Sequence, residues 1–164
     1  MDGYEGFLKF NNDGVLEING SIVVYCDIDI GDGKYTIKYS GNANLISTRN
    51  ITIGAQFIPE NMNNFPSIDL MVLISQNNID LNLTNAKGGK YDDPKAAAML
   101  IANIEVETKT NTFLKGSTVS RSLVLGQNTE IHYEAGIEEA LTAGVPGFGE
   151  KMITTINWQE IIAD

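Results

Sequence analysis

The single histidine of the chain sits between two carboxylates, which makes it the first candidate for acid–base chemistry. His132 lies in the segment Thr129-Glu-Ile-His-Tyr-Glu134, where strand alternation places it on the same side as Glu130 and Glu134. A histidine beside carboxylates can act as a general acid or base. No serine or cysteine in a recognisable nucleophile turn accompanies it, and Cys26 lies on an apolar strand face that is typical of a small core residue. We therefore interpret His132 as a titratable surface residue, predict no catalytic residue, and expect that the protein is not an enzyme.

A second candidate is the acidic segment Asp27-Ile-Asp-Ile-Gly-Asp-Gly33, which looks like a calcium-binding loop. Its acidic residues occupy positions 1, 3 and 6, whereas an EF-hand places ligands at 1, 3 and 5 and a glutamate at 12, where this chain has Lys38. The favoured interpretation is a strand end with solvated aspartates followed by a turn. Whether Asp27, Asp29 and Asp32 bind a cation is left open by the sequence.

Two glycine-rich segments could suggest a phosphate-binding loop. Gly144-Val-Pro-Gly-Phe-Gly149 lacks the Gly-Lys-Ser/Thr ending and precedes a predicted strand instead of a helix, and Gly88-Gly89-Lys90 fails for the same reason. We expect Gly144–Gly149 to be a flexible or interface-forming loop. One His and one Cys in the chain also exclude a disulfide framework and a multi-cysteine metal site, so no cofactor or metal is predicted.

The charge balance excludes several classes of partner. With 21 Asp and Glu against 11 Lys and Arg, the net charge is -10, which is unlike the basic surfaces that grip nucleic acid or anionic membranes. The acidic residues form either a solubilising face or a surface that repels nucleic acid or meets a basic partner. Those on predicted strands could line one face of a sheet. The acidic residues of the last third are Glu105, Glu107, Glu130, Glu134, Glu138 and Glu139.

Strand and turn signals dominate the chain. Tyr4–Phe10 is a predicted strand that ends at the turn Asn11–Gly14, and Asn19-Gly20 is a strong hairpin signal between Val15–Ile18 and Ser21–Ile30. Because strand follows strand in hairpin fashion, we predict a mainly β fold, an antiparallel barrel or sandwich. The further predicted strands are 34–40, 49–58, 79–84, 104–109, 118–125, 129–134 and 151–158, and 68–75 is a buried strand or a short helix.

One or two short helices are expected beside the sheet. Asp93-Pro94 has the residues of a helix start, so Lys95–Ala102 is predicted as a helix whose second half could be strand, and Gly136–Ala143 as a further helical turn or two. Pro59–Pro66 is a predicted polar loop. No internal repeat or linker is evident, and we expect one β-rich domain over residues 1–164.

No targeting segment is visible at the acidic N-terminus, and the longest apolar run, Ala96–Ala102, is about a third of a membrane span. We therefore expect synthesis in the cytoplasm of a host cell and no membrane partner.

Two pairs of segments resemble the tail-tube proteins of bacteriophages and related contractile injection systems. They are Lys34–Ser40 with Arg49–Ile53, and Ala102–Thr108 with Val119–Leu125, and with their surroundings they cover roughly half of the chain. The resemblance implies rings of subunits whose sheets close into an inner barrel, with loops that reach the next ring. An electronegative lumen would let DNA slide without sticking, which fits the net charge. A baseplate, connector or capsid-decorating protein would have similar features.

The sequence thus favours a structural subunit of a virion or injection machine that self-associates into rings or stacks, without specific nucleic-acid binding. The alternative is a monomeric β-sandwich or barrel module that binds a small ligand or glycan. Aromatic side chains could line such a site, although at strand spacing they also suit a core. These aromatic residues are Tyr25, Tyr35, Tyr39, Phe57 and Trp158.

Overall fold

Short strands account for nearly all regular structure in residues 6–137, the part of the chain that the computed structural model describes. The strands are β1 (Phe7–Phe10), β2 (Leu16–Val24), β3 (Ile28–Ile30), β4 (Thr36–Ser47), β5 (Ile51–Ile53), β6 (Gln56–Pro59), β7 (Leu70–Ser75), β8 (Asn78–Leu81), β9 (Ala96–Ala102), β10 (Glu105–Thr108), β11 (Phe113–Val119), β12 (Ser122–Val124) and β13 (Glu130–His132). A 3-10 turn, η1 (Met62–Asn64), lies between β6 and β7.

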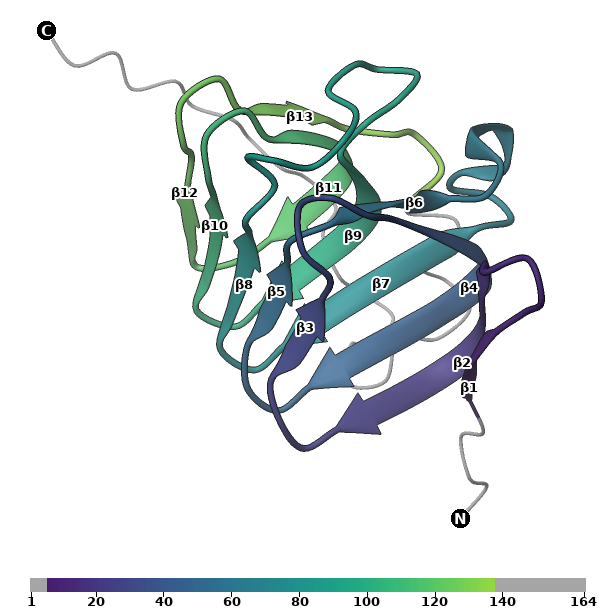
Figure 1. The fold of residues 1–164 in the computed structure, drawn as a ribbon. Helices are drawn as coiled ribbons and strands as arrows, with labels where there is room; N and C mark the ends of the chain where they lie inside the picture. The colour runs from purple at the N-terminus through teal and green to yellow at the C-terminus, as the bar shows by residue number, and fades with distance from the viewer. Residues whose placement is uncertain (1–5, 138–164) are drawn as a thin grey trace, which may run out of the picture.

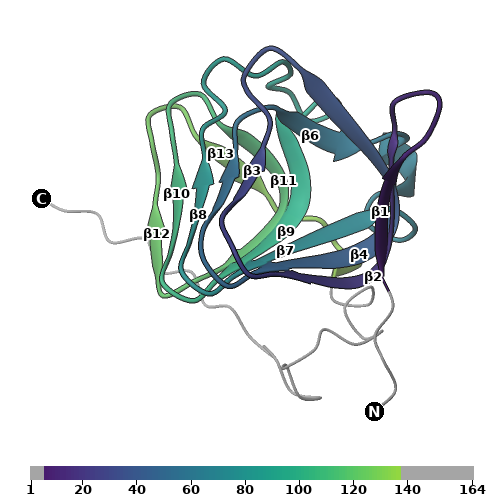
Figure 2. The ribbon, with the colours of Figure 1, turned by 60° about the horizontal axis from the view of Figure 1, so that its bottom comes forward.

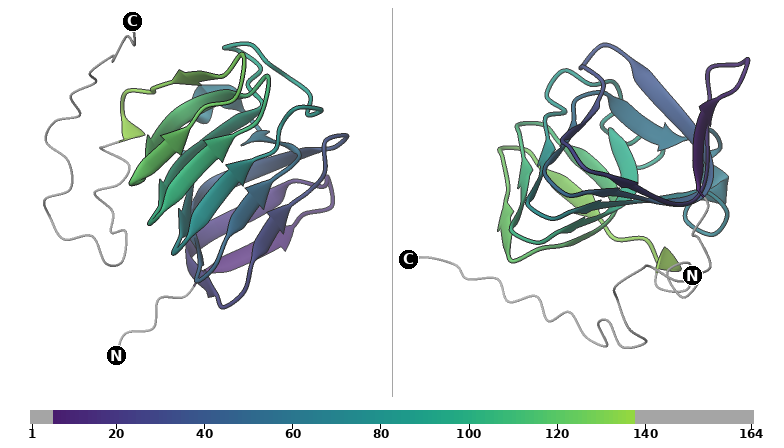
Figure 3. Two further views of the ribbon diagram at one scale, coloured as in Figure 1. Left: turned by 90° about the vertical axis from the view of Figure 1, so that its left-hand side faces the viewer. Right: turned by 90° about the horizontal axis from the view of Figure 1, so that it is seen from below.

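The strands form two sheets in which neighbours run parallel. The larger sheet has the order β1-β2-β4-β6-β9-β11-β13, with β7 also between β4 and β9, and the smaller has the order β12-β10-β8-β5-β3 (Figure 1). Within the described residues only the β1–β2 pair of strands is antiparallel. The strands of the smaller sheet lie side by side with their arrows pointing the same way in the left view of Figure 3. The predicted antiparallel barrel or sandwich is therefore wrong.

The parallel pairing arises because the chain winds as a solenoid. Successive strands alternate between the two sheets, so each strand pairs with its equivalent one coil later, as in other stacked β-repeat architectures. One row of paired residues runs across the smaller sheet, and its successive members are 23, 28, 27 and 17 residues apart in the sequence. The row is Ile28, Ile51, Ile79, Val106 and Leu123. An internal repeat therefore exists, and the prediction of none is wrong because the coils differ in length.

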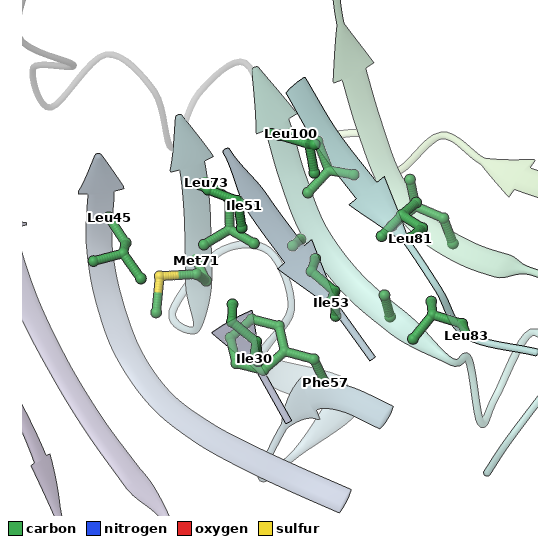
Figure 4. Packing of buried hydrophobic residues seen from close by; sticks show 14 of the residues in the cluster. Ile30, Leu45, Ile51, Ile53, Phe57, Met71, Leu73, Leu81, Leu83 and Leu100 are labelled. Carbon is green, nitrogen blue, oxygen red and sulfur yellow. The ribbon is translucent and has the colours of Figure 1, made fainter. Parts of the chain in front are cut away.

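The hydrophobic core fills the space between the two sheets. Leu45, Leu73 and Leu100 form a register row of the larger sheet, and their side chains point toward Ile51 and Leu81 of the smaller sheet (Figure 4). Four of these five side chains are fully buried, and Leu45 is nearly so. Burial of such aliphatic side chains contributes about 1.5–3 kcal/mol each, so these rows hold the coils together.

The predicted helix over Lys95–Ala102 is instead strand β9, where all seven residues from Ala96 to Ala102 are buried. The strand is covered on both faces. Leu100 belongs to the core between the sheets, whereas Met99 belongs to a second apolar cluster on the outer face of the larger sheet. A strand that is buried on both faces is a continuous apolar run, and such a run has no periodicity that separates it from a buried helix.

The chain between β6 and β7 interrupts one coil of the solenoid, in the region where a polar loop was predicted over Pro59–Pro66. Strand β4 pairs first with β6 and then with β7, and the chain between them leaves the sheet. At this gap the buried carboxylate of Asp69 accepts the backbone N–H of Gly41 at 2.7 Å and a side-chain N–H of Asn64 at 3.0 Å. Asp69 thus supplies the hydrogen bond that an uninterrupted neighbouring strand would have supplied.

Of the two predicted N-terminal hairpins, one is present. Asn11 caps the β1–β2 turn, because its side-chain oxygen accepts the backbone N–H groups of Asp13 and Val15 at 3.0 Å, and Gly14 has a φ of 76°. Asn19 and Gly20, in contrast, lie inside the continuous strand β2, so the prediction of a turn there is wrong. Gly20 has a positive φ of 75°, but it is paired in register with Ala43 of β4.

Cys26 lies at the corner between β2 and β3 and is exposed, so its placement as a small core residue is wrong. The predicted single strand Ser21–Ile30 is bent here, and the corner residues turn outward. The carbonyl of Cys26 accepts the hydroxyl of Ser47 at 2.7 Å, which ties this corner to the next coil. The predicted loop Gly144–Gly149, the predicted strand 151–158 and most of the predicted helical turn 136–143 lie outside the described residues.

Candidate functional site

His132 and Glu130 are brought together as predicted, on the last strand of the larger sheet. The His132 Nε2 atom lies 3.1 Å from the Glu130 carboxylate, and the imidazole ring stacks on Phe113 with centroids 4.7 Å apart. Strand β13 pairs in register with β11, which places Phe113 opposite Glu130 and Lys115 opposite His132. The stacking on Phe113 holds one face of the imidazole ring.

Glu134 follows the end of this strand and contacts a different set of residues. Its carboxylate accepts the Tyr91 hydroxyl at 2.6 Å and lies 3.2 Å from the Lys115 ammonium, which sits 4.2 Å above the centre of the Tyr91 ring. The Glu134 hydrogen bond and charge raise the pKa of the Tyr91 phenol, because the carboxylate stabilises the protonated hydroxyl. The ring of His132 packs edge-on against Tyr91 with centroids 5.6 Å apart.

These six residues form the clamp, a cluster defined as Tyr91, Phe113, Lys115, Glu130, His132 and Glu134. Within this cluster, Lys115 lies beside the Glu134 carboxylate and His132 beside the Glu130 carboxylate. The Lys115 and Glu134 side chains are only 11% and 16% exposed, which makes their ion pair a structural connection between β11, the segment after β13 and the loop that carries Tyr91. Sequence alone could not reveal Tyr91, which is 41 residues away from His132.

The three aspartates of the calcium-like segment do not converge. Asp27 lies at a corner, where its carboxylate accepts the backbone and side-chain N–H groups of Asn50 at 3.0 Å each. These hydrogen bonds lower the pKa of Asp27, since they favour the charged form. Asp29 is exposed on β3, and Asp32 lies in the following turn. In residues 6–137 no three His, Cys, Asp or Glu residues gather where they could hold a metal ion.

The acidic residues on the predicted strands of the last third do not share one sheet, so the prediction that they could line one face is wrong, and Glu138 and Glu139 lie outside the described residues. Glu105 and Glu107 belong to β10 in the smaller sheet, whereas Glu130 belongs to β13 in the larger. On the smaller sheet, Glu107 is directly opposite Asp80 of β8. Burial, and then the hydrogen bond and charge of Glu107, raise the pKa of Asp80, while an ion pair with Lys109 lowers the pKa of Glu107.

The Gly88-Gly89-Lys90 segment is a tight structural turn. The Gly89 and Lys90 backbone N–H groups both donate to the Asp93 carbonyl, at 2.8 and 3.2 Å. A Cβ atom at Gly88 would lie 2.7 Å from that same oxygen, so only glycine fits. The neighbouring Lys95 is buried, and its ammonium donates to the Leu83 carbonyl at 2.7 Å. Burial lowers the pKa of Lys95.

Of the aromatic residues proposed for a ligand site, two are buried in the core and two are exposed. Tyr39 and Phe57 are core residues with ring centroids 4.9 Å apart, and the Tyr39 hydroxyl donates to the Ala97 carbonyl at 2.7 Å. Tyr25 and Tyr35 are 81% and 65% exposed. Trp158 lies outside the described residues.

A feature that the sequence analysis missed is the N-terminal end of the solenoid. Strand β1 pairs with β2 alone among the described strands, and all four of its residues are exposed (Figure 2). Leu8 is opposite Ile18 and Phe10 is opposite Leu16, and both of these β2 residues pack in or against the core. Leu8 and Phe10 therefore continue the core-facing side of the larger sheet beyond β3, the last strand of the smaller sheet.

Three of the four residues of β1 are large apolar residues with exposed side chains. Phe7, Leu8 and Phe10 are 49%, 39% and 60% exposed. Ile22 and Ile28 in the first coil are only partly buried, unlike their fully or nearly fully buried equivalents in the next three coils. Solenoids require a polar cap at each end, whereas the described residues of this end present an apolar surface and a strand edge that pairs with no other described strand.

Comparisons with known proteins provide no further identification: no family model, no curated protein and no solved structure matches this chain. Residues 6–137 include no helix that is long and apolar enough to span a membrane.

Proposed function

We propose that this chain is a structural, non-enzymatic subunit that self-associates through the N-terminal end of its solenoid. The observation that carries the proposal is the edge of β1 that pairs with no other described strand, together with the exposed Leu8 and Phe10 side chains, which extend the core face past the first coil. An unpaired strand with apolar side chains is a template for pairing with another chain. A second copy offers the same edge and the same apolar residues, and two such ends form a symmetric contact.

The clamp supports a structural role in preference to an enzymatic one. The Lys115 ammonium is paired with the Glu134 carboxylate, and the rings of His132 and Phe113 stack, so the clamp ties together the end of the solenoid opposite to β1. Association through one end alone produces a dimer, and rings or longer stacks require a second surface. The place of this subunit in a phage virion or injection machine remains part of the proposal and rests on the sequence resemblance alone.

The test is the native mass of the full chain, measured by light scattering over a concentration and salt series. We expect a mass that rises from 17.9 kDa toward twice that value with concentration. Added salt should favour association, because it screens the repulsion between copies that each have a net charge of -10.

A matched pair of substitutions locates the contact. Phe10→Glu places a charge on β1 at a side chain that is 60% exposed, and Ile68→Glu makes the same change at a side chain that is 61% exposed in the loop before β7. Phe10→Glu should give a monomer at every concentration, whereas Ile68→Glu should associate like the wild type. A strictly monomeric wild type, or equal loss of association in both variants, would contradict the proposal.

A further inference from the structure

The outer face of the larger sheet has a continuous apolar ladder, which we call the outer stripe. Five residues occupy one register row across five neighbouring strands, and each of them is β-branched and aliphatic. The outer stripe consists of Val23, Ile46, Ile74, Ile101 and Val119. The row lies on the face that points away from the core between the sheets, because the residues on either side in sequence, such as Leu45 and Leu73, belong to that core.

The corresponding outer row of the smaller sheet is very different. It consists of Asp29, Thr52, Asp80, Glu107 and Val124. Four of its five residues are polar, as expected for a face in contact with water. The same molecule thus has one outer face built for solvent and one built for burial, which indicates that a further layer covers the outer stripe.

The last described residue already packs on the outer face of the larger sheet. Ile137, the last of them, is 1% exposed and packs in the second apolar cluster with Ile101 and Met99 on this same face. Within the stripe Ile101 is 5% exposed, Val119, Ile74 and Ile46 are partly exposed, and Val23 at the N-terminal end of the row is 49% exposed. Ser117, two residues before Val119, has a buried hydroxyl oxygen without a hydrogen-bond partner among the described residues, so a polar group of the covering layer could bond to it.

The chain that follows Ile137 has the length and composition to complete this layer. Residues 138–164 number 27 and span up to about 90 Å when extended, whereas five strands at the usual spacing are about 19 Å across. The segment also contains large apolar residues at intervals. They are Leu141, Val145, Phe148, Met152, Ile153, Ile156, Trp158, Ile161 and Ile162.

We infer that residues 138–164 of the same chain pack on the outer stripe and bury Ile74, Ile46 and Val23, with Trp158 in the contact. This intramolecular layer is independent of the association through β1 that is proposed above, because it covers a sheet face and not the end of the solenoid.

Trp158 is the only tryptophan of the chain, so its fluorescence tests the inference on the full chain without a label. In the folded wild type we expect emission at shorter wavelength than in urea, and acrylamide quenching several-fold weaker than in urea. Ile74→Glu, and Val23→Glu at the exposed end of the stripe, should raise the quenching toward the unfolded level while the circular dichroism stays that of a folded β protein. Thr52→Glu, which adds the same charge to the outer face of the smaller sheet, is the matched control and should leave Trp158 protected.

Three results would overturn the inference. Trp158 could be quenched as strongly in the folded wild type as in urea, which means that the segment does not pack on the fold. Protection that persists in both stripe variants places Trp158 elsewhere. Protection that is lost on dilution of the wild type means that a second copy supplies the covering segment.

Discussion

Truncating the isoleucines of one register row is expected to cost much more stability in the middle of the solenoid than at its N-terminal end. Ile28, Ile51 and Ile79 are successive members of the row in the smaller sheet. Ile51 and Ile79 are fully buried, whereas Ile28 in the first coil is only partly buried. Isoleucine-to-alanine substitutions at these three positions therefore remove the same atoms from three successive coils.

The magnitudes follow from the packing around each side chain. Ile79 lies between Ile51 and Val106, both fully buried, and paired strands on both sides limit collapse of the cavity. Ile79→Ala should thus cost about 4 kcal/mol, in the upper part of the range for such truncations. Ile28 has a row neighbour on one side only, and water already reaches it, so Ile28→Ala should cost about 1–2 kcal/mol.

Urea unfolding followed by far-UV circular dichroism measures these differences, with Ile51→Ala as a second internal position. The Ile28 and Ile79 variants should differ by about 2–3 kcal/mol, or about 4–12 °C in melting temperature. The m-values should be unchanged, so that the midpoints report stability. Dilute protein is required, because association through β1 would bury Ile28. Equal losses at Ile28 and Ile79 in dilute solution would refute the placement of β3 in a terminal coil.

Three further predictions test the clamp, the acidic pair and a close backbone approach. Glu134→Gln should destabilise the fold by about 2–3 kcal/mol, because it leaves the mostly buried Lys115 ammonium without its carboxylate. In a double-mutant cycle measured by urea denaturation, the double variant with Lys115→Met should regain most of this loss. Additive free-energy changes would contradict the ion pair. Asp80→Asn should stabilise by about 0.2–1 kcal/mol at pH 7, because it removes like charges directly opposite each other. Since the folded-state pKa of Asp80 is raised, the folded protein binds the Asp80 proton more tightly than the unfolded chain does. The melting temperature of Asp80→Asn should therefore exceed that of the wild type at pH values above the folded-state pKa, and the difference should disappear below the ordinary carboxyl pKa. A stabilisation that is independent of pH would count against the pairing with Glu107. Gly116→Ala should cost about 3 kcal/mol or prevent folding, because Gly116 has a φ of 150° and a Cβ atom there would lie 1.9 Å from a carbonyl oxygen of β9. A normal soluble yield and melting curve would show that β11 can move away from β9 to make room for the methyl group.

The β character of the chain and several local features could be predicted from residue types and their spacing. The predicted strand 49–58 contains β5 and most of β6, because its β-branched and aromatic residues favour extended backbone. The turn Asn11–Gly14 followed from residues that bond within the turn itself. The approach of His132 to Glu130 followed from their spacing of two residues in a strand.

The pairing of the strands and the contacts between residues of different coils could not be predicted in this way. Alternation is the same in parallel and antiparallel strands, so it could not exclude the hairpins predicted here. Unequal coils hid the repeat, and the apolar run of β9 concealed a strand covered on both faces. The contact of Tyr91 with Lys115 and Glu134 depends on a loop that returns to the stack, and the exposure of Phe10 depends on where the smaller sheet ends. Such contacts depend on three-dimensional neighbours, which residue type and local spacing do not specify.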